Sequence, residues 1–163
     1  VYNGGGFCYN RRMIKILFVC HGNICRSPMA EFYMRDYVNK RGRGGDYEIA
    51  SAATSNEEIG NPVHCGTKKK LAELGISAEG KRARRLTAAD GEYYDYIVGM
   101  DGRNVRDILR IVGGHGEKVF RLLDIAGERR DVADPWYTGD FDATLRDVKI
   151  GCEALFKLTE NKE

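Results

Sequence analysis

The chain has 163 residues, of which 42% are hydrophobic, and its formal net charge is +2. This length supports one domain with a substantial core and gives no sign of a second. A net charge so close to zero offers no case for nucleic acid as a partner, and no apolar stretch approaches the ~20 residues that cross a bilayer. We therefore expect neither nucleic-acid nor membrane contact, and we predict a monomer.

The cysteines bear on the compartment. Five of them, an odd number, are scattered along the chain, which argues against a disulfide framework and favours a reducing environment. No secretory signal pattern opens the sequence, so we predict a cytoplasmic protein. Residues 1–12 are rich in glycine, hold Cys8 and precede Met13. We expect them to form a flexible N-terminal extension before a single domain at 13–163.

Apolar and β-branched runs predict four strands, with helices between them. In chain order the strands are expected at Ile14–Val19, Tyr47–Ala50, Tyr94–Val98 and Lys118–Leu122. Three stripes at helical spacing are expected to face the core, namely Met29, Phe32, Tyr33 and Tyr37, then Val105, Ile108, Leu109 and Val112, then Phe141, Leu145, Val148, Cys152 and Leu155. Glycines at 75 and at 113–114 predict helix ends. This alternation predicts an α/β fold in which helices cover both faces of a parallel sheet.

The loop after the first predicted strand indicates the chemistry. Residues 20–27 read Cys-His-Gly-Asn-Ile-Cys-Arg-Ser, and the following Ser27-Pro28 pair is typical of a helix start. Such a loop directs its backbone N–H groups at an oxyanion, and the helix dipole adds partial positive charge. The residues predicted to bind phosphate are His21, Gly22, Asn23, Ile24, Cys25 and Arg26.

Each residue type in this loop suits a phosphate site. Cys20 is the candidate nucleophile, because amide groups, a helix N-terminus and an arginine all stabilise a thiolate. Arg26 offers a planar fork that can hold two phosphoryl oxygens at once. Ser27 is placed to donate its hydroxyl to the thiolate or to the loop, and it is expected to cap the helix. Gly22 is expected to permit a backbone angle that most residues resist, and Asn23 either to adopt such an angle or to tie the loop together by side-chain hydrogen bonds.

Residues 19–31 resemble the phosphate loop of the low-molecular-weight protein tyrosine phosphatases, which reads Val-Cys-x-Gly-Asn-Ile-Cys-Arg-Ser-Pro followed by Met-Ala-Glu. The resemblance extends from Met13 to about Phe156, because the family's Asp-Pro-aromatic loop recurs at residues 134–137 as Asp-Pro-Trp-Tyr. It implies a four-stranded parallel sheet with helices on both faces, a flavodoxin-like three-layer sandwich. It also implies metal-independent hydrolysis of phosphotyrosine proteins and aryl phosphates through a cysteinyl-phosphate, with release of inorganic phosphate.

By the same match, Asp134 is the general acid. The chemistry also requires such a group, because a phenolate is a poor leaving group and a carboxylic acid that protonates it contributes typically ~10²–10⁴-fold. Once ionised, Asp134 can take a proton from the water that hydrolyses the cysteinyl-phosphate. The sequence has neither a dinucleotide glycine fingerprint nor a Walker lysine pattern, and His64-Cys65 has no second pair at ligand spacing. We therefore expect no cofactor and no metal.

The predicted pocket has two kinds of wall. Ile24, Trp136 and Tyr137 are expected to offer apolar surfaces suited to an aryl ring. Many family members have a tryptophan in the loop after the second strand, whereas this chain has Glu57 and Glu58 there. An acidic wall thus replaces an aromatic one.

Several further residues are expected to lie around the loop. His21 occupies a position that the family leaves variable, and it is expected to point outward, where it can tune the charge of the rim. Cys25 is placed to capture an oxidised Cys20 as a disulfide and so protect it from over-oxidation. Lys81 stands where family members often carry a histidine, which leaves the corresponding network open. The basic cluster of Lys81, Arg82, Arg84 and Arg85 is expected to be a solvated helix face, and the alternative is a rim that attracts anionic phosphoproteins.

Three alternative functions remain at this point. Arsenate reductases of the same fold share a similar loop but need a further cysteine pair, and this chain has no cysteine between Gly75 and Asp95. Protein arginine phosphatases resemble the sequence more closely, yet they carry threonine where this chain has Ile24. A phosphotyrosine-binding module without turnover needs neither Cys20 nor Asp134, so the presence of both argues against it.

Overall fold

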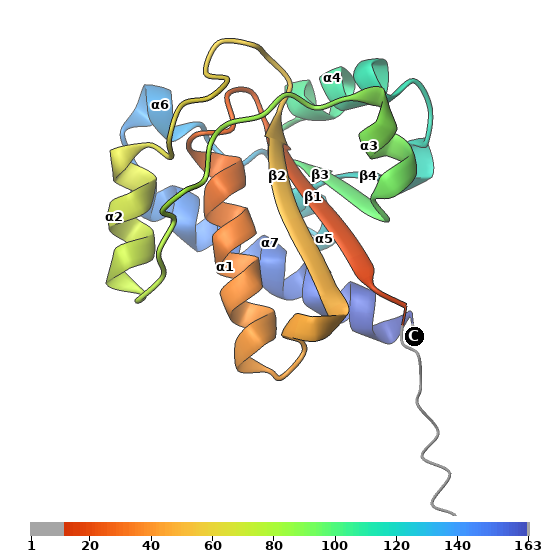
Figure 1. The fold of residues 1–163 in the computed structure, drawn as a ribbon, viewed down its shortest axis with the longest axis horizontal. Coiled ribbons are helices and arrows are strands. Elements are labelled where there is room, and N and C mark those ends of the chain that lie inside the picture. Colours follow the sequence, from red (N-terminus) through yellow and green to blue (C-terminus); the bar gives the residue numbers. More distant parts are fainter. Residues whose placement is uncertain (1–11, 163) are drawn as a thin grey trace, which may run out of the picture.

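The computed structural model describes residues 12–162, which form a four-stranded sheet with helices around it (Figure 1). Every strand pair is parallel, and the strand order is β2-β1-β3-β4. The strands are β1 (Ile14–Cys20), β2 (Tyr47–Ala53), β3 (Tyr96–Gly99) and β4 (Val119–Arg121). The predicted parallel sheet is therefore confirmed. Strand β2 runs three residues past its predicted end, since it pairs with β1 as far as the Cys20–Ala53 position.

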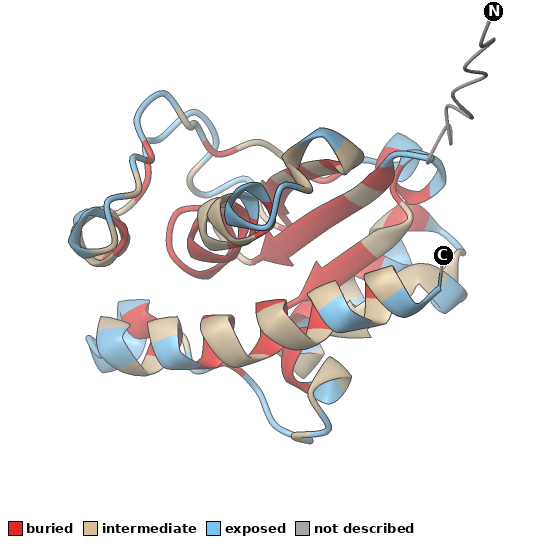
Figure 2. Ribbon diagram, turned by 90° about the horizontal axis from the view of Figure 1, so that it is seen from below, coloured by how far each residue is buried: buried red, intermediate tan, exposed pale blue. Residues whose placement is uncertain are grey.

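Helices cover both faces of the sheet, as predicted. They are α1 (Arg26–Lys40), α2 (Cys65–Glu73), α3 (Ala88–Tyr93), α4 (Gly102–Val112), α5 (Leu122–Ile125), α6 (Pro135–Thr138) and α7 (Phe141–Asn161). Short 3₁₀ helices occur at Gly44–Asp46 and Gly116–Lys118. Helices α1, α5 and α7 pack together on one face, while α3 and α4 lie on the other. Figure 2 shows the buried strands between these layers.

The three predicted helical stripes are only partly buried; in α7, Val148, Cys152 and Leu155 are buried but Phe141 and Leu145 are half-buried. In α1 the buried residues include Met29, Met34 and Val38, whereas the predicted Phe32, Tyr33 and Tyr37 are half-buried. Tyr33 and Tyr37 lie toward α7, where Tyr33 donates to Glu153 and the Tyr37 ring meets Phe156 edge-on. In α4, Ile108 and Val112 face the core but Leu109 is 40% exposed. The glycine helix ends are confirmed, because Gly75 and Gly113 follow their helices with φ of 75° and 68°.

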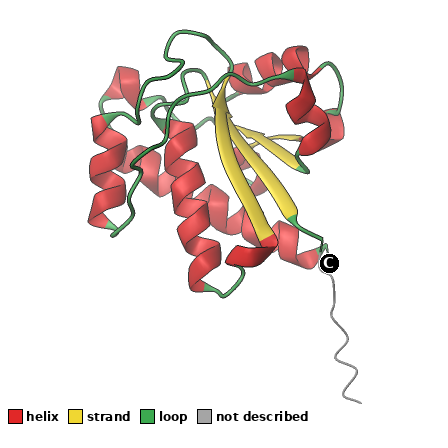
Figure 3. Cartoon of the chain, viewed as in Figure 1, coloured by secondary structure: helices red, strands yellow, loops and turns green. Residues whose placement is uncertain are grey.

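The strand order of the sheet indicates where a ligand can bind. The chain passes from β1 to β2 on one side and then crosses to β3 on the other, so the strand order reverses between β1 and β3. Clefts form outside the carboxyl ends of parallel strands at such a point. Figure 3 shows loops gathered at that end, including the loop that leads from β1 to α1.

The amino-terminal prediction is largely untested. Apart from Arg12, which donates to Asp95 at 2.9 Å, the expected extension at 1–12 lies outside the described residues. Among residues 12–162, no helix combines the length and the apolar character that a membrane span requires.

Candidate active site

The Cys20 side chain lies at the carboxyl end of β1 and is only 3% exposed. Its sulfur is 3.3 Å from the Asn23 backbone nitrogen, which donates to it, and 3.0 Å from the Ser27 hydroxyl oxygen. Helix α1 begins at Arg26, so its N-terminus opens beside the sulfur. Donors and a positive helix end together stabilise the thiolate form.

Asn23, not Gly22, adopts the unusual backbone angle in this loop. Asn23 has a φ of 60°, while Gly22 lies outside the left-handed region, so the expectation for Gly22 was wrong. Hydrogen bonds of the Asn23 side-chain amide offset the conformational cost of this positive φ. The amide donates to the hydroxyls of Ser27 and Ser51 at 2.8 Å each and accepts from the Arg84 backbone nitrogen. A side chain at Gly22 would begin 3.3 Å from the Glu58 Cγ atom, so the glycine leaves room for that glutamate.

The expectation that Ser27 caps helix α1 was also wrong. The helix already includes Ser27, the cap position belongs to Cys25, and the Cys25 side chain makes no capping hydrogen bond. The Ser27 side chain is fully buried and turns instead toward Cys20 and Asn23. It therefore joins the nucleophile to the amide that holds the loop.

The Arg26 guanidinium is 3% exposed and is fixed from three directions. Its Nη1 donates to the Asp101 carboxylate at 2.7 Å and to the Val132 carbonyl at 2.9 Å, and its Nη2 lies 3.4 Å from Asp134. Burial alone would lower the pKa of Arg26, but the Cys20 thiolate, the bond to Asp101 and the charge of Asp134 outweigh it and raise that pKa. Arg26 therefore stays cationic beside the sulfur.

Asp101 was not predicted from the sequence. It directly follows the β3 region, caps α4 by accepting from Asn104, and turns its other oxygen to Arg26. An aspartate after a strand and before a helix, with asparagine three positions on, is a recognisable capping signal. Its contact with Arg26 depends on the tertiary fold.

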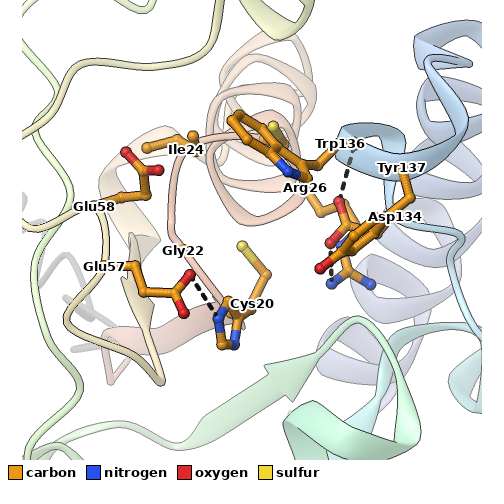
Figure 4. Close-up of a pocket in the computed structure, with 11 residues that line it drawn as sticks. Cys20, Gly22, Ile24, Arg26, Glu57, Glu58, Asp134, Trp136 and Tyr137 are labelled. Carbon is orange, nitrogen blue, oxygen red and sulfur yellow. Dashed lines mark hydrogen bonds and ion pairs between the residues drawn. The ribbon is translucent and has the colours of Figure 1, made fainter.

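Asp134 lies at the rim and caps the short helix α6. One carboxylate oxygen accepts from the Trp136 backbone nitrogen at 3.1 Å, and the other faces Arg26. Pro135 occupies the first turn, where a missing N–H costs nothing. Figure 4 shows Asp134 on the side of Trp136 and Tyr137, across the pocket from Glu57.

The predicted pocket residues meet around one cavity. It is lined by Cys20, His21, Gly22, Ile24, Cys25, Arg26, Glu57, Glu58, Asp134, Trp136 and Tyr137. Asn23 and Ser27 do not line it and support the loop from within. His21 lies at the mouth, half-exposed, with its Nε2 3.1 Å from Glu57. Trp136 and Tyr137 are 58% and 83% exposed, so the aromatic wall stands open to solvent.

Lys81 completes a buried network beneath the loop. Its ammonium lies 3.2 Å from the Glu31 carboxylate and donates to the Ser51 carbonyl at 2.9 Å. The Ser51 hydroxyl donates to the same carboxylate and accepts a hydrogen bond from the Asn23 side-chain amide. Burial lowers the pKa of Lys81, and the charge of Glu31 opposes that effect. Lys81 thus joins this network at the position where family members often carry a histidine.

We expect Lys81→Met to lower the free energy of unfolding by about 1–3 kcal/mol, because it leaves the Glu31 carboxylate, 2% exposed, with fewer partners. Arg35 still pairs with Glu31 at 2.8 Å, which limits the loss. Urea unfolding measures the change. The matched control is Lys40→Met, whose lysine is 65% exposed and should cost no more than about 0.5 kcal/mol. Equal costs for the two variants would show that the buried network adds nothing to stability.

The expectation of a solvated helix face at residues 81–85 was wrong. This segment is not helical; it runs beside the end of β2, where the Ala53 nitrogen donates to the Arg84 carbonyl. Arg84 pairs with Asp90 at 3.0 Å. Lys81 and Arg84 thus pair with the buried carboxylates of Glu31 and Asp90, whereas Arg82 is exposed.

His64 and Cys65 have separate surroundings. The His64 ring accepts from the Gly66 nitrogen, so it caps α2, and it stacks on Phe141 with the Trp136 ring edge-on at 5.9 Å. Cys65 is exposed. Over the described stretch 12–162, no group of three His, Cys, Asp or Glu side chains could hold a metal ion.

Comparison with known proteins agrees with this geometry. Residues 15–163 match the family described as low molecular weight phosphotyrosine protein phosphatase. The chain is 42% identical over 146 residues to the low molecular weight protein-tyrosine-phosphatase YfkJ of Bacillus subtilis (strain 168), covering 88% of this chain and 94% of that protein. The crystal structure of YfkJ from Bacillus subtilis aligns with a TM-score of 0.89 at 40% identity, over 93% of this chain and 97% of that one. The crystal structure of DARP, a drosophila arginine phosphatase, aligns with a TM-score of 0.82 at 25% identity, over 90% and 98%. The chain therefore belongs to the low molecular weight phosphotyrosine protein phosphatase family and is an enzyme of that class.

Proposed function

We propose that this protein hydrolyses phosphotyrosine in proteins, and aryl phosphates generally, through a phosphocysteine at Cys20. The observation that carries the proposal is that Cys20, Arg26 and Asp134 line one pocket although Asp134 lies more than a hundred residues away in the chain. A nucleophile, a fixed cation and an acid are the three groups that transfer of a phosphoryl group from a phenol requires.

The first step forms the S–P bond. The Cys20 thiolate attacks phosphorus while the bond to the phenolic oxygen breaks, and Asp134 in its protonated form gives its proton to that oxygen. Asp101 and Val132 hold Nη1 of Arg26, and one hydrogen of Nη2 faces Asp134. The Nε hydrogen and the second hydrogen of Nη2 can then grip two phosphoryl oxygens side by side. Arg26 is thus preorganised for the charge that develops in the transition state.

The second step breaks the S–P bond. Water attacks phosphorus from the side that the phenol has left, and the Asp134 carboxylate accepts the proton that the water loses. The electron pair of the S–P bond returns to Cys20 as thiolate, which the Ser27 hydroxyl and the Asn23 nitrogen stabilise. Inorganic phosphate is the product, and the enzyme returns to its starting protonation state when Asp134 retains the proton.

The side chains that line the pocket indicate the substrate class. Ile24, Trp136 and Tyr137 offer apolar surfaces around the pocket, which suit an aryl ring better than the polar guanidinium of phosphoarginine. Arginine phosphatase activity remains the second candidate, since the fold accommodates it in another protein. We further propose that the enzyme acts as a monomer in the cytoplasm, where a reducing environment maintains the thiolate.

A direct test compares initial rates on matched phosphotyrosine, phosphoserine and phosphoarginine peptides in the presence of EDTA. The proposal expects turnover of the phosphotyrosine peptide to exceed the other two clearly. A faster rate on phosphoarginine would favour the second candidate, and dependence on a divalent cation would reject the phosphocysteine route.

We also expect Cys25 to protect Cys20 from irreversible oxidation. Burial, followed by the charges of Cys20 and Asp134, raises the pKa of Cys25 to about 12, so Cys25 stays a thiol while Cys20 is the site that peroxide attacks. A sulfenic acid on Cys20 can condense with the Cys25 thiol to a disulfide with loss of water. Peroxide should then inactivate the wild type reversibly.

The matched variant is Cys25→Ser, with Cys152→Ser as a control for loss of another buried thiol. After peroxide and dithiothreitol, Cys25→Ser should recover much less activity than the wild type and should lack a Cys20–Cys25 disulfide in peptide mass spectrometry. Equal recovery of the two proteins would restrict Cys25 to a packing role.

A further inference from the structure

One wall of the catalytic pocket is acidic. Glu57 and Glu58 line the same pocket as Cys20 and Arg26, and Figure 4 shows them on the side opposite Tyr137. A phosphorylated substrate brings negative charge into this pocket. Two carboxylates at its edge therefore oppose binding unless a cation accompanies them.

Among residues 12–162, Glu57 has a side chain that can carry positive charge beside it, whereas Glu58 has a neutral partner. The Glu57 carboxylate lies 3.1 Å from His21 Nε2. Glu58 instead accepts a hydrogen bond from the Asn61 side-chain amide at 2.6 Å, which is a neutral donor. Across residues 12–162, no lysine or arginine forms an ion pair with Glu58. Its negative charge is therefore uncompensated beside a site for an anion.

Glu58 is also fixed in place. Its Cγ atom would lie 3.3 Å from a side chain at Gly22, so the glutamate packs against the phosphate loop. The Asn61 amide holds one carboxylate oxygen and leaves the other available. The charge of Glu58 also contributes to the raised pKa of Cys25 on the pocket floor, after burial and the nearer charges. Because the charge of Glu58 is felt at Cys25, it also repels a phosphate group bound in the same pocket.

We propose that Glu58, with Glu57 beside it, selects phosphotyrosine segments that carry a lysine or arginine next to the phosphotyrosine. The inference rests on the proposed function, since Cys20 and Arg26 define where the phosphate lies. Lysine and arginine carry their charge at the end of a long stem, so a residue adjacent to the phosphotyrosine can reach the rim. The substrate cation then supplies the positive charge that Glu58 does not receive from the described residues, and segments with adjacent acidic residues are disfavoured.

The test uses phosphotyrosine peptides that differ only in the residues flanking the phosphotyrosine, which are arginine, alanine or glutamate. The measured quantity is the ratio of kcat/KM for the arginine and alanine peptides, because chemistry that is common to both cancels. We expect the wild type to prefer arginine about three- to fivefold, as for a partly exposed ion pair, and to lose most of this preference at high salt. In Glu58→Gln, which keeps an acceptor for Asn61, the ratio should fall toward one. Glu58→Lys should reverse it in favour of the glutamate peptide.

The control is Glu117→Gln, which removes the same charge from the 3₁₀ helix before β4, at the opposite edge of the sheet, and should keep the wild-type ratio. A wild type that hydrolyses p-nitrophenyl phosphate but treats the three peptides alike would overturn this inference alone. So would a preference that survives in Glu58→Gln. A wild type that hydrolyses neither p-nitrophenyl phosphate nor any peptide would overturn the proposed function, and this inference with it.

Discussion

Replacement of Cys20 by serine is expected to lower kcat for phosphotyrosine peptides and for p-nitrophenyl phosphate by at least about 10⁴-fold. A neutral hydroxyl is a far weaker nucleophile than the thiolate that the Asn23 nitrogen, the Ser27 hydroxyl and the start of α1 stabilise. The phosphate-binding groups remain in place, because Arg26 is held by Asp101 and by the Val132 carbonyl rather than by the sulfur. Calorimetry should therefore still detect inorganic phosphate binding to Cys20→Ser.

The chain offers a matched control in Cys65, an exposed cysteine at the start of α2. Cys65→Ser should retain wild-type rates, and acid quenching during turnover should trap phosphate on the wild type and on Cys65→Ser but not on Cys20→Ser. Substantial turnover by Cys20→Ser, or a trapped phosphoenzyme in that variant, would show that another residue is the nucleophile.

Local sequence was sufficient for the parts of the site that a short stretch of chain builds. The loop at 20–27 follows a buried strand and precedes a helix, and this order alone places Cys20 and the helix start together. The parallel sheet was predictable for a similar reason, since alternating strands and helices leave few topologies. The expectation for Gly22 failed because the backbone of the neighbouring Asn23 adopts the positive φ instead. The expectation for Ser27 failed because the helix already includes this residue and its hydroxyl bonds to Cys20 and Asn23.

Contacts across the fold could not be predicted in the same way. Asp101 is recognisable as a helix cap, but its bond to Arg26 exists only because β3 lies next to β1 in the sheet. Lys81 looked like one member of a solvated basic cluster, whereas the fold buries it against Glu31. A residue's type and spacing indicate what it can bind, and only the tertiary arrangement determines which partner it meets.

Asp134→Asn is expected to slow hydrolysis of a phosphotyrosine peptide by about 10²–10⁴-fold, while p-nitrophenyl phosphate should lose considerably less. The amide cannot protonate the departing phenolate, and that proton matters most when the phenolate is a strong base. Asparagine is the informative replacement, because it still caps α6 by accepting from the Trp136 nitrogen and so keeps the aromatic wall in position.

The measurement is the ratio of the two rate losses, obtained from kcat/KM, which reports the phosphorylation step. A second test measures kcat/KM for a series of aryl phosphates whose leaving phenols differ in pKa. The wild-type value should vary little with the pKa of the phenol, whereas the value for Asp134→Asn should fall steeply as that pKa rises. Asp131→Asn is the control, since Asp131 lies three residues earlier, pairs with Arg121 and does not line the pocket. Equal losses on the two substrates, or an unchanged dependence on the phenol, would assign Asp134 to positioning Arg26 through their 3.4 Å contact rather than to proton transfer. The expected steep dependence in Asp134→Asn alone would identify Asp134 as the group that protonates the leaving phenol.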